Sequence, residues 1–404
     1  MLTSYFDYHL PAELIAQSPA PSRDQSRLMV VHRSRLAIEH RQFSDITEYL
    51  RAGDVLVLND SRVIPARLWA VKPGTGGLVE ILLLEPAERA RWWALVRPAK
   101  RVRPGSQLTL IRRGSTTGGV LPCPGRSTEP CKADNSVVKE PAVTPAVTVV
   151  EKQAAGRCLI DFSHAGDMQS VLERYGEVPL PPYLERKGPP SDEDRERYQT
   201  VYARTPGSVA APTAGLHFTR ELLDRIEKAG VQVCSLTLHV GLATFAPVKA
   251  ACVEDHTLHE EHFELPKATA NAVNSAKREG RRVVAVGTTV TRVLESVAAG
   301  NYIPEGVLAG AESSGSGASQ EAVGVLPGAC RGRTRLFIYP PYRFRVVDVL
   351  LTNFHLPRST LLMLVCAFGK PGDVAGREMI LACYNCAVQE RYRFYSYGDA
   401  MLIL

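Results

Sequence analysis

Apolar and polar positions in the second half of the chain follow helical and strand periods in turn. Between Thr219 and Gly230, the residues Leu222, Leu223 and Ile226 fall on one face of a helix, predicted over 219–229, that the threonine can cap and the glycine can end. Such alternation, which residues 1–62 share, is typical of an α/β domain. The other predicted elements are strands at 53–60, 231–240, 282–286, 336–339 and 346–351, and helices at 267–279 and 290–298.

Residues 66–164 show a different pattern, with short β-rich runs between Gly and Pro turns. These runs predict a small antiparallel β-barrel. The predicted fold class is therefore α/β, with a discontinuous α/β catalytic domain at 1–65 and 165–404 and an inserted β-barrel domain at 66–164. The barrel runs are 67–71, 78–84, 92–96, 107–111 and 158–162.

Two segments lack periodicity. Residues 114–153 are rich in Thr, Pro, Ser, Gly and Val and are predicted to form a disordered or loosely ordered low-complexity insertion between two barrel strands. Residues 301–332 are rich in Gly, Ala and Ser and are predicted to form a flexible loop insertion. Neither segment is assigned a function.

Composition adds little to this picture. The net charge of +6, from 48 basic and 42 acidic residues, permits an RNA partner without requiring one. The first residues lack the basic and apolar regions of a secretory signal, and the longest apolar stretch, 361–369, is about half the length of a membrane span. We therefore expect a cytoplasmic protein that does not cross a membrane.

Two patterns are candidate metal sites. Cys383 and Cys386 form a CxxC inside a predicted helix with no second pair nearby, and the nine cysteines together fit reduced thiols. His256, His259 and His262 sweep round a helix and run into a strand, so metal binding is the weaker interpretation. We predict neither a metal nor a prosthetic group.

The segment VAAPTAGLHFT, residues 209–219, places Thr213 and His217 in a tight loop before a helix. The helix N-terminus could hold an anion beside that hydroxyl and ring, although the segment alone fits an ordinary strand-to-helix turn better. Four further strand-end loops are polar, and such loops collect ligand groups in α/β folds. Together they indicate an enzyme. The loops are 59–62, 237–244, 287–289 and 352–355.

A basic strip follows two indoles in the predicted barrel. This combination could track a phosphate backbone and stack a base. The alternative is a solvated barrel edge whose charges prevent edge-to-edge pairing, and both interpretations stay open. The residues are Trp92, Trp93, Arg97, Lys100, Arg101 and Arg103.

Ten segments distributed almost end to end resemble the S-adenosylmethionine:tRNA ribosyltransferase-isomerase family of queuosine biosynthesis. The two insertions depart from the family's pattern, and so does His262, which stands at a usually aromatic position, whereas His256 and His259 fit. The segments are DYHLPAELIAQSP (7–19), RDQSRLMV (23–30), LVLNDSRVIPARL (56–68), PLPPYL (179–184), YQTVYAR (198–204), VAAPTAGLHF (209–218), LTLHVGLATFAPV (236–248), VAVGTTVTRVLES (284–296), LLTNFHLPRSTLLMLV (350–365) and YRFYSYGDAML (392–402).

The resemblance implies that S-adenosylmethionine is a substrate, so no cofactor is expected. Its ribosyl moiety is transferred to the amine of 7-aminomethyl-7-deazaguanine, at the wobble position of a tRNA with a GUN anticodon, and isomerised. The products are epoxyqueuosine in tRNA, adenine and methionine. We expect a monomer whose partners are this tRNA and S-adenosylmethionine. A binding-only RNA protein and an ordinary methyltransferase are the rival hypotheses, although the glycine-rich turn of the latter is missing.

The implied chemistry needs a proton acceptor near neutrality, because the sulfonium acidifies neighbouring hydrogens and the attacking amine must be neutral. The structural alternatives are that Asp60 caps a turn, that His239 and His355 are packed core histidines and that Thr288 caps its helix. The predicted catalytic residues are His217, ranked first, with His239, His355 and Asp60. Those predicted to bind S-adenosylmethionine are Thr213, Gly215, Thr237, Gly241, Gly287, Thr288, Thr289 and Asn353. Those predicted to bind RNA are Arg62, Arg97, Lys100, Arg101 and Arg103.

Overall fold

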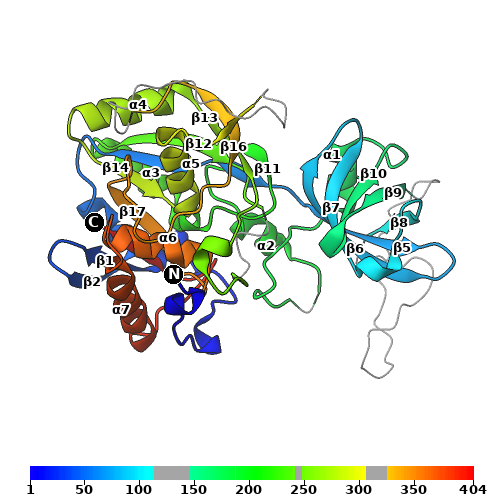
Figure 1. Ribbon diagram of the computed structural model, residues 1–404, viewed down its shortest axis with the longest axis horizontal. Helices are drawn as coiled ribbons and strands as arrows, with labels where there is room; N and C mark the ends of the chain where they lie inside the picture. Colours follow the sequence, from blue (N-terminus) through cyan, green and yellow to red (C-terminus); the bar gives the residue numbers. More distant parts are fainter. Residues whose placement is uncertain (113–144, 187, 242–247, 306–324) are drawn as a thin grey trace. The chain divides into compact units, whose positions relative to one another are not determined.

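The computed structural model describes residues 1–112, 145–186, 188–241, 248–305 and 325–404 (Figure 1). The chain forms two compact units. The larger comprises Met1–Ile64, Leu180–Arg186 and Ser191–Leu404, and the smaller comprises Pro65–Pro179 and Lys187–Pro190. A mixed α/β unit with an inserted antiparallel barrel confirms the predicted fold class. In the described part of the chain, no helix is both long and apolar enough to cross a membrane.

A ten-stranded mixed sheet runs through the larger unit in the order β15-β16-β13-β12-β3-β14-β17-β18-β1-β2. Its four central strands, β12, β3, β14 and β17, pair in parallel, with Leu56 of β3 opposite Val233 and Val284. Their carboxyl ends therefore reach the same edge. The strands are β1 (Arg27–His32), β2 (Ala37–Gln42), β3 (Val55–Asn59), β12 (Gln232–Leu238), β13 (Glu261–Leu265), β14 (Val283–Val286), β15 (Ile303–Pro304), β16 (Cys330–Thr334), β17 (Val349–Asn353) and β18 (Ala400–Ile403), and β4 (Ser61–Val63) pairs separately with β11 (Thr205–Ser208).

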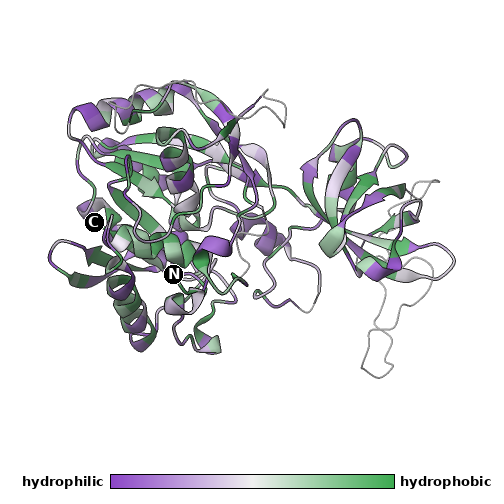
Figure 2. Ribbon diagram, viewed as in Figure 1, coloured by the Kyte–Doolittle hydropathy of each residue, from purple (hydrophilic) through white to green (hydrophobic). Residues whose placement is uncertain are grey.

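Both faces of this sheet are covered, and the central strands β3 and β14 are buried along their whole length and mostly apolar (Figure 2). In β3, Val55 and Val57 pack into the core that contains side chains of α4 to α7, whereas Leu56 and Leu58 pack with α3 and η4. Burial on both faces is why these strands read as continuous apolar runs. The helices are α2 (Asp192–Arg197), α3 (Arg220–Lys228), α4 (Lys267–Arg278), α5 (Thr288–Ala298), α6 (Thr360–Gly369) and α7 (Gly376–Gln389), with 3₁₀ turns η1 (Thr3–Phe6), η2 (Ala12–Leu14), η3 (Arg23–Gln25), η4 (Phe43–Glu48), η7 (Thr213–His217) and η9 (Val253–Asp255).

The smaller unit contains a closed antiparallel barrel in the order β10-β7-β6-β5-β8-β9. Alternate residues of each strand are buried, as in β5, where Leu68 and Ala70 have no exposed surface. The elements are β5 (Arg67–Lys72), β6 (Gly77–Pro86), β7 (Arg91–Arg97), η5 (Ala99–Arg101), β8 (Gln107–Ile111), β9 (Ala146–Lys152), η6 (Ala154–Gly156), β10 (Arg157–Asp161) and α1 (Met168–Tyr175).

The structure corrects both predicted insertions. Residues 146–152, assigned to the disordered segment 114–153, form β9, whose buried Val147 and Val149 alternate across the barrel wall. The predicted loop 301–332 contains β15 and the start of β16. The strand predicted at 336–339 is wrong: β16 ends at Thr334, and residues 335–339 form neither strand nor helix. At Gly332 a side chain would meet the carbonyl oxygen of Ile303, so a glycine that suggested a loop allows close strand pairing. Residues 113–144 and 306–324 lie outside the described part of the chain.

Candidate functional site

Asn59 links three of the four polar loops at the carboxyl edge of the central strands. Its Nδ2 donates to the carbonyl of Leu238 at 3.0 Å and to Thr289 Oγ1 at 3.3 Å. Its Oδ1 accepts the N–H groups of Ser61 at 3.1 Å and Leu238 at 3.0 Å. All four hydrogen-bonding positions of this fully buried amide are therefore used to fix the ends of β3 and β12 against the start of α5.

A pocket of about 340 Å³, here called the α5 pocket, opens beside the N-terminus of α5. Gly287 leads from β14 into this helix with φ of +91°, and no side chain caps it. The first N–H groups of a helix have no partner within it, and the dipole makes this end positive, so the pocket wall favours an anion. The lining residues are Ala211, Pro212, Thr213, Ala214, Val240, Gly287, Thr288, Thr289, Thr352, Asn353, His355 and Leu361.

The helix that follows the segment 209–219 does not supply this end. The short turn η7 separates that loop from α3, and the Thr219 hydroxyl accepts the N–H of Leu222 at 3.1 Å. The first turn of α3 lines none of the three pockets described in this section. α5, unlike α3, presents its N-terminus to one of these pockets, and Thr213 reaches that pocket from η7.

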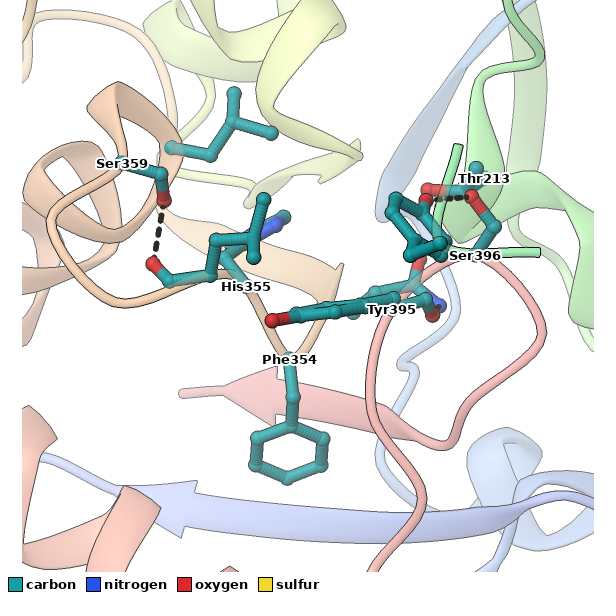
Figure 3. A pocket seen from close by; sticks show the side chains of 10 residues that line it. Thr213, Phe354, His355, Ser359, Tyr395 and Ser396 are labelled. Atoms are coloured by element: carbon teal, nitrogen blue, oxygen red, sulfur yellow. Dashed lines mark hydrogen bonds between the residues drawn. The ribbon is translucent and has the colours of Figure 1, made fainter. Parts of the chain in front are cut away.

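A second pocket, of about 310 Å³ and here called the tyrosine pocket, shares Thr213, Asn353, His355 and Leu361 with the α5 pocket (Figure 3). The two pockets are therefore neighbours with a common wall. Its other lining residues are Tyr183, Phe354, Leu356, Ser359, Tyr395 and Ser396.

Two tyrosines give the tyrosine pocket its aromatic surface. The rings of Tyr183 and Tyr395 lie 4.7 Å apart at 53°, and the Tyr183 hydroxyl is 2.6 Å from Ser396 Oγ. Tyr395 has φ of +73°, which is rare outside glycine, and in Figure 3 its ring extends toward His355. Burial raises the pKa of Tyr183 to about 12 and raises that of Tyr395 as well. The surface is thus aromatic and uncharged, which suits a planar base.

Asn353 stands in the wall that both pockets share. Its Nδ2 donates to the carbonyl of Tyr395 at 3.2 Å and to His217 Nε2 at 3.1 Å. The carbonyl can only accept, so the orientation of the amide is set. Its Oδ1 is buried without a hydrogen-bond partner among the described residues, and the residue is 2% exposed. An unpaired buried acceptor costs about 1–3 kcal/mol, so this oxygen is a candidate for a ligand's N–H or O–H group.

His217 is held as a neutral ring. Because Nε2 accepts from Asn353, Nδ1 carries the hydrogen and donates to Ser26 Oγ at 2.7 Å. The ring stacks on Phe43 with centroids 4.9 Å apart. Burial, with smaller effects of Arg393 and Arg23, lowers the pKa of His217 to about 3. Both ring nitrogens are engaged, and the residue lines neither the α5 pocket nor the tyrosine pocket.

His355, in contrast, lines both pockets. Its Nε2 is 2.8 Å from Thr352 Oγ1, while its backbone N–H donates to Tyr384 and its carbonyl accepts from Tyr8. Burial lowers the pKa of His355 to about 3. When Nε2 donates to Thr352, Nδ1 presents a lone pair, and no described residue hydrogen-bonds to it.

Asp60, Thr237 and His239 form a separate cluster that lines none of these pockets. The Asp60 carboxylate accepts from Thr237 Oγ1 at 2.6 Å and from Arg204 at 2.7 Å. His239 lies against Gly207, where an added Cβ would come within 2.7 Å of the ring. Burial and, to a smaller extent, the neighbouring His262 lower the pKa of His239. Nδ1 of His239 is buried without a partner in the described chain.

Two predicted glycines also lie away from the pockets. Gly215 packs against the Tyr202 hydroxyl, so that any side chain there would clash. Gly241 donates its N–H to Glu261 Oε1 at 3.0 Å, and the other oxygen of that carboxylate pairs with buried Arg292. Both positions support the loops around the site.

The residues predicted to bind RNA are exposed. Arg62 lies on β4 in the larger unit, and the four basic residues Arg97, Lys100, Arg101 and Arg103 follow β7 in the barrel. Arg101 donates to the carbonyl of Leu78 at 3.0 Å. The indole of Trp93 is covered by the Arg157 guanidinium, 4.6 Å from its centroid, so Trp93 offers no open face on that side.

Sequence reasoning missed the tyrosine pocket and a third pocket that contains three arginines. Tyr183, Tyr395, Arg23, Arg197 and Arg393 lie in or beside resembling segments, yet no periodicity or spacing marks them as neighbours. They converge only through tertiary structure. Among the described residues, no group of three His, Cys, Asp or Glu side chains is arranged to hold a metal ion.

Comparisons with known proteins cover almost the whole chain. Residues 3–403 match a family model described as "Queuosine biosynthesis protein". The chain is 50% identical over 400 residues to the S-adenosylmethionine:tRNA ribosyltransferase-isomerase of Thermus thermophilus, covering 99% of this chain and 98% of the relative. It is 45% identical over 404 residues to that of Halothermothrix orenii, covering 100% of both chains. A crystal structure of S-adenosylmethionine tRNA ribosyltransferase from Thermotoga maritima aligns over 99% of this chain and 100% of that one, at 35% identity and a TM-score of 0.49.

Proposed function

This chain belongs to the S-adenosylmethionine:tRNA ribosyltransferase-isomerase family of queuosine biosynthesis, and we propose that the α5 and tyrosine pockets together bind its S-adenosylmethionine. The acceptor is the amine of 7-aminomethyl-7-deazaguanine in a tRNA with a GUN anticodon. Epoxyqueuosine in tRNA, adenine and methionine are the products. The observation that carries the proposal is the unpartnered Oδ1 of Asn353, in the wall that the two pockets share.

The pockets suit different parts of this substrate. The methionyl carboxylate lies at the N-terminus of α5, where backbone N–H groups and the hydroxyls of Thr288 and Thr289 meet it. The adenine stacks in the tyrosine pocket against Tyr395. Asn353 Oδ1 accepts a hydrogen bond from the sugar or from the adenine amine.

A proton must leave the carbon beside the sulfonium before adenine can depart. We assign this step to His355, in place of His217, because His355 faces both pockets with Nδ1 free of described partners. The imidazole takes the proton from the 5′ carbon, and the freed electron pair forms a double bond to the 4′ carbon as the bond from that carbon to the ring oxygen breaks. The ring oxygen then forms a carbonyl with the 1′ carbon, and the electron pair of the bond to adenine leaves with adenine. The resulting imidazolium returns the proton to the departing adenine. The negative charge of the bound methionyl carboxylate offsets part of the effect of burial on the pKa of His355.

His217 then has a positioning role. It accepts one N–H of Asn353 and thereby helps to aim Oδ1 of the amide at the ligand. Asp60 and Thr237 support the neighbouring loops from the separate cluster around His239.

The test is to measure S-adenosylmethionine affinity and single-turnover adenine release in Asn353→Ala and His355→Gln. We expect Asn353→Ala to weaken binding about tenfold, and His355→Gln to slow adenine release by about 10²–10⁴-fold with little change in affinity. His259→Gln removes an exposed imidazole outside the pockets and is the control. Near-normal binding by Asn353→Ala, together with near-normal turnover by His355→Gln, would contradict the proposal.

A further inference from the structure

The third pocket, of about 270 Å³ and here called the arginine pocket, lies next to the proposed reaction site. It shares Ser396 with the tyrosine pocket and includes His217, which bonds to Asn353. None of its lining residues is acidic. They are Pro19, Ala20, Arg23, Ser26, Arg197, Leu216, His217, Arg393, Ser396, Tyr397 and Gly398.

The arginines are anchored mainly by backbone carbonyls, which leaves their charge largely uncompensated. Arg23 donates to the carbonyls of Leu216 and Glu196, both at 3.1 Å. Among the described residues, Arg197 likewise donates to backbone oxygens alone, those of residues 20 and 21. Burial and the neighbouring Arg197 charge lower the pKa of Arg23, which is the signature of cations gathered together.

Two carboxylates act on these arginines from outside the pocket lining: the Glu196 charge acts on Arg23, and Asp399 lies beside Arg393 but is already hydrogen-bonded. Asp399 Oδ1 is 3.8 Å from Arg393 Nε. The two oxygens of Asp399 accept the backbone N–H groups of Arg27 at 2.9 Å and Arg393 at 2.8 Å. The carboxylate is 2% exposed and does not line the pocket, so three guanidinium groups face a cavity without a lining anion.

Two polar atoms of the pocket are buried without a partner in the described chain. They are Arg197 Nε and the hydroxyl of Tyr397, a residue that is 4% exposed. Unpaired buried donors are rare, because a buried polar group that loses its bonds to water without gaining a partner destabilises the fold. Both can donate to an oxyanion. The Tyr397 hydroxyl is uncharged, so it is independent of the charge argument, and it points to the same kind of ligand.

We propose that the arginine pocket binds a phosphate of the RNA substrate's backbone and so holds the acceptor nucleotide beside the reaction site. Planar guanidinium forks suit the several oxygens of a phosphate, and the Tyr397 hydroxyl adds a neutral donor. The methionyl carboxylate of S-adenosylmethionine is an oxyanion too, but the proposed function places it at the N-terminus of α5, in a different pocket. This inference rests on the proposed function, because that function supplies the RNA.

The test measures binding of an unmodified RNA stem-loop with a GUN anticodon over a range of salt concentrations, without S-adenosylmethionine. Arg197→Gln should weaken binding at least tenfold and reduce the slope of log K against log salt by about one. Arg278→Gln removes an exposed charge from α4 and should leave both quantities unchanged. Unchanged RNA affinity in Arg197→Gln would overturn the proposal.

Tyr397→Phe provides a second test that does not depend on a charge or on a large change in packing. It removes a hydroxyl that has no partner among the described residues, so the melting temperature should be equal or higher while RNA affinity falls about fivefold. A lower melting temperature with unchanged RNA affinity would mean that the hydroxyl is structural and would contradict the proposal.

Two further readouts separate the sources of the oxyanion and the two proposals. If the pocket holds the methionyl carboxylate instead, Arg197→Gln will weaken S-adenosylmethionine binding and spare RNA, which overturns the phosphate assignment. The RNA measurement needs no turnover. A wild-type protein that releases no adenine would therefore contradict the proposed function and leave the arginine-pocket proposal standing. Normal turnover by the wild-type protein, together with normal RNA binding by Arg197→Gln, would contradict the arginine-pocket proposal and leave the proposed function standing.

Discussion

The titratable and polar side chains at the candidate site are uncharged at neutral pH. His217 and His355 are both buried, with pKa values lowered to about 3 by burial, and Asn353 presents an uncharged oxygen to the pockets. A neutral lining does not repel the sulfonium of the substrate, whereas a protonated imidazole would. The charges lie instead at the α5 dipole and among the arginines of the adjacent pocket.

The lowered pKa values predict acid sensitivity. Between about pH 6.5 and pH 3 the unfolded chain binds more protons at these histidines than the native state does, so stability falls as the pH decreases through this window. At pH 5 each histidine contributes a loss of about 2 kcal/mol relative to neutral pH. Urea unfolding should show that His355→Gln loses about 2 kcal/mol less than the wild type between pH 7 and pH 5. Equal losses in the two proteins would mean that His355 titrates normally in the native state.

At the scale of elements, the parallel order β12-β3-β14-β17 determines which loops meet at the candidate site. It brings Asn59, Gly287 and Asn353 to one edge although they are far apart in the chain. The start of α5 lines the α5 pocket, and no described side chain caps it, so it is the element that we propose to meet the methionyl carboxylate.

Gly287→Ala tests that element. The residue has φ of +91°, so alanine should destabilise the fold by about 1 kcal/mol or more and shift the α5 N-terminus, which weakens S-adenosylmethionine binding severalfold. Gly280→Ala, at φ of +69° with open space around it, shares the backbone penalty but should leave binding unchanged. Urea unfolding and ligand titration measure the two effects. Equal binding losses in both variants would show that the effect is general and does not arise at the pocket.

The strongly periodic elements can be predicted from the sequence, and the weakly periodic ones cannot. The Thr219 cap and the helix after it are confirmed, because local hydrogen bonding and an amphipathic face determine them. The strand β9 escapes prediction, since its few alternating valines lie within a Thr- and Pro-rich segment. A periodic pattern of apolar residues appears when one face of an element is buried. A short strand contains too few residues for this pattern to stand out from its surroundings.

The site can be predicted in part for the same reason. Thr213, Thr288, Thr289, Asn353 and His355 follow strands or open helices, and the structure gathers them in the α5 pocket. The tyrosines of the tyrosine pocket and the arginines of the arginine pocket escape prediction, because they come from separate segments that only tertiary contacts bring together. The family resemblance covers those turns without indicating which side chains face a cavity.

For the whole molecule, the two units separate the proposed chemistry from the barrel's basic strip. All three pockets are lined entirely by residues of the larger unit, whereas Arg97, Lys100, Arg101 and Arg103 belong to the smaller one. If the strip binds tRNA backbone, its contribution is electrostatic and independent of sequence.

Replacing these four residues by glutamine tests that role. We expect weaker tRNA binding and a salt slope reduced by about one for each phosphate that the strip no longer neutralises, with unchanged affinity for S-adenosylmethionine. Replacing four exposed basic residues of the larger unit, Arg220, Lys228, Lys267 and Arg278, by glutamine provides a control that matches the change in net charge. An unchanged salt slope would favour the alternative, in which the strip only keeps the barrel edge from pairing.

The most direct measurement is mass spectrometry of the products formed by the purified protein from S-adenosylmethionine and tRNA that carries 7-aminomethyl-7-deazaguanine. We predict equal amounts of adenine and methionine, with epoxyqueuosine appearing in the tRNA at the same rate. Formation of S-adenosylhomocysteine, or tRNA binding with S-adenosylmethionine left intact, would contradict this prediction.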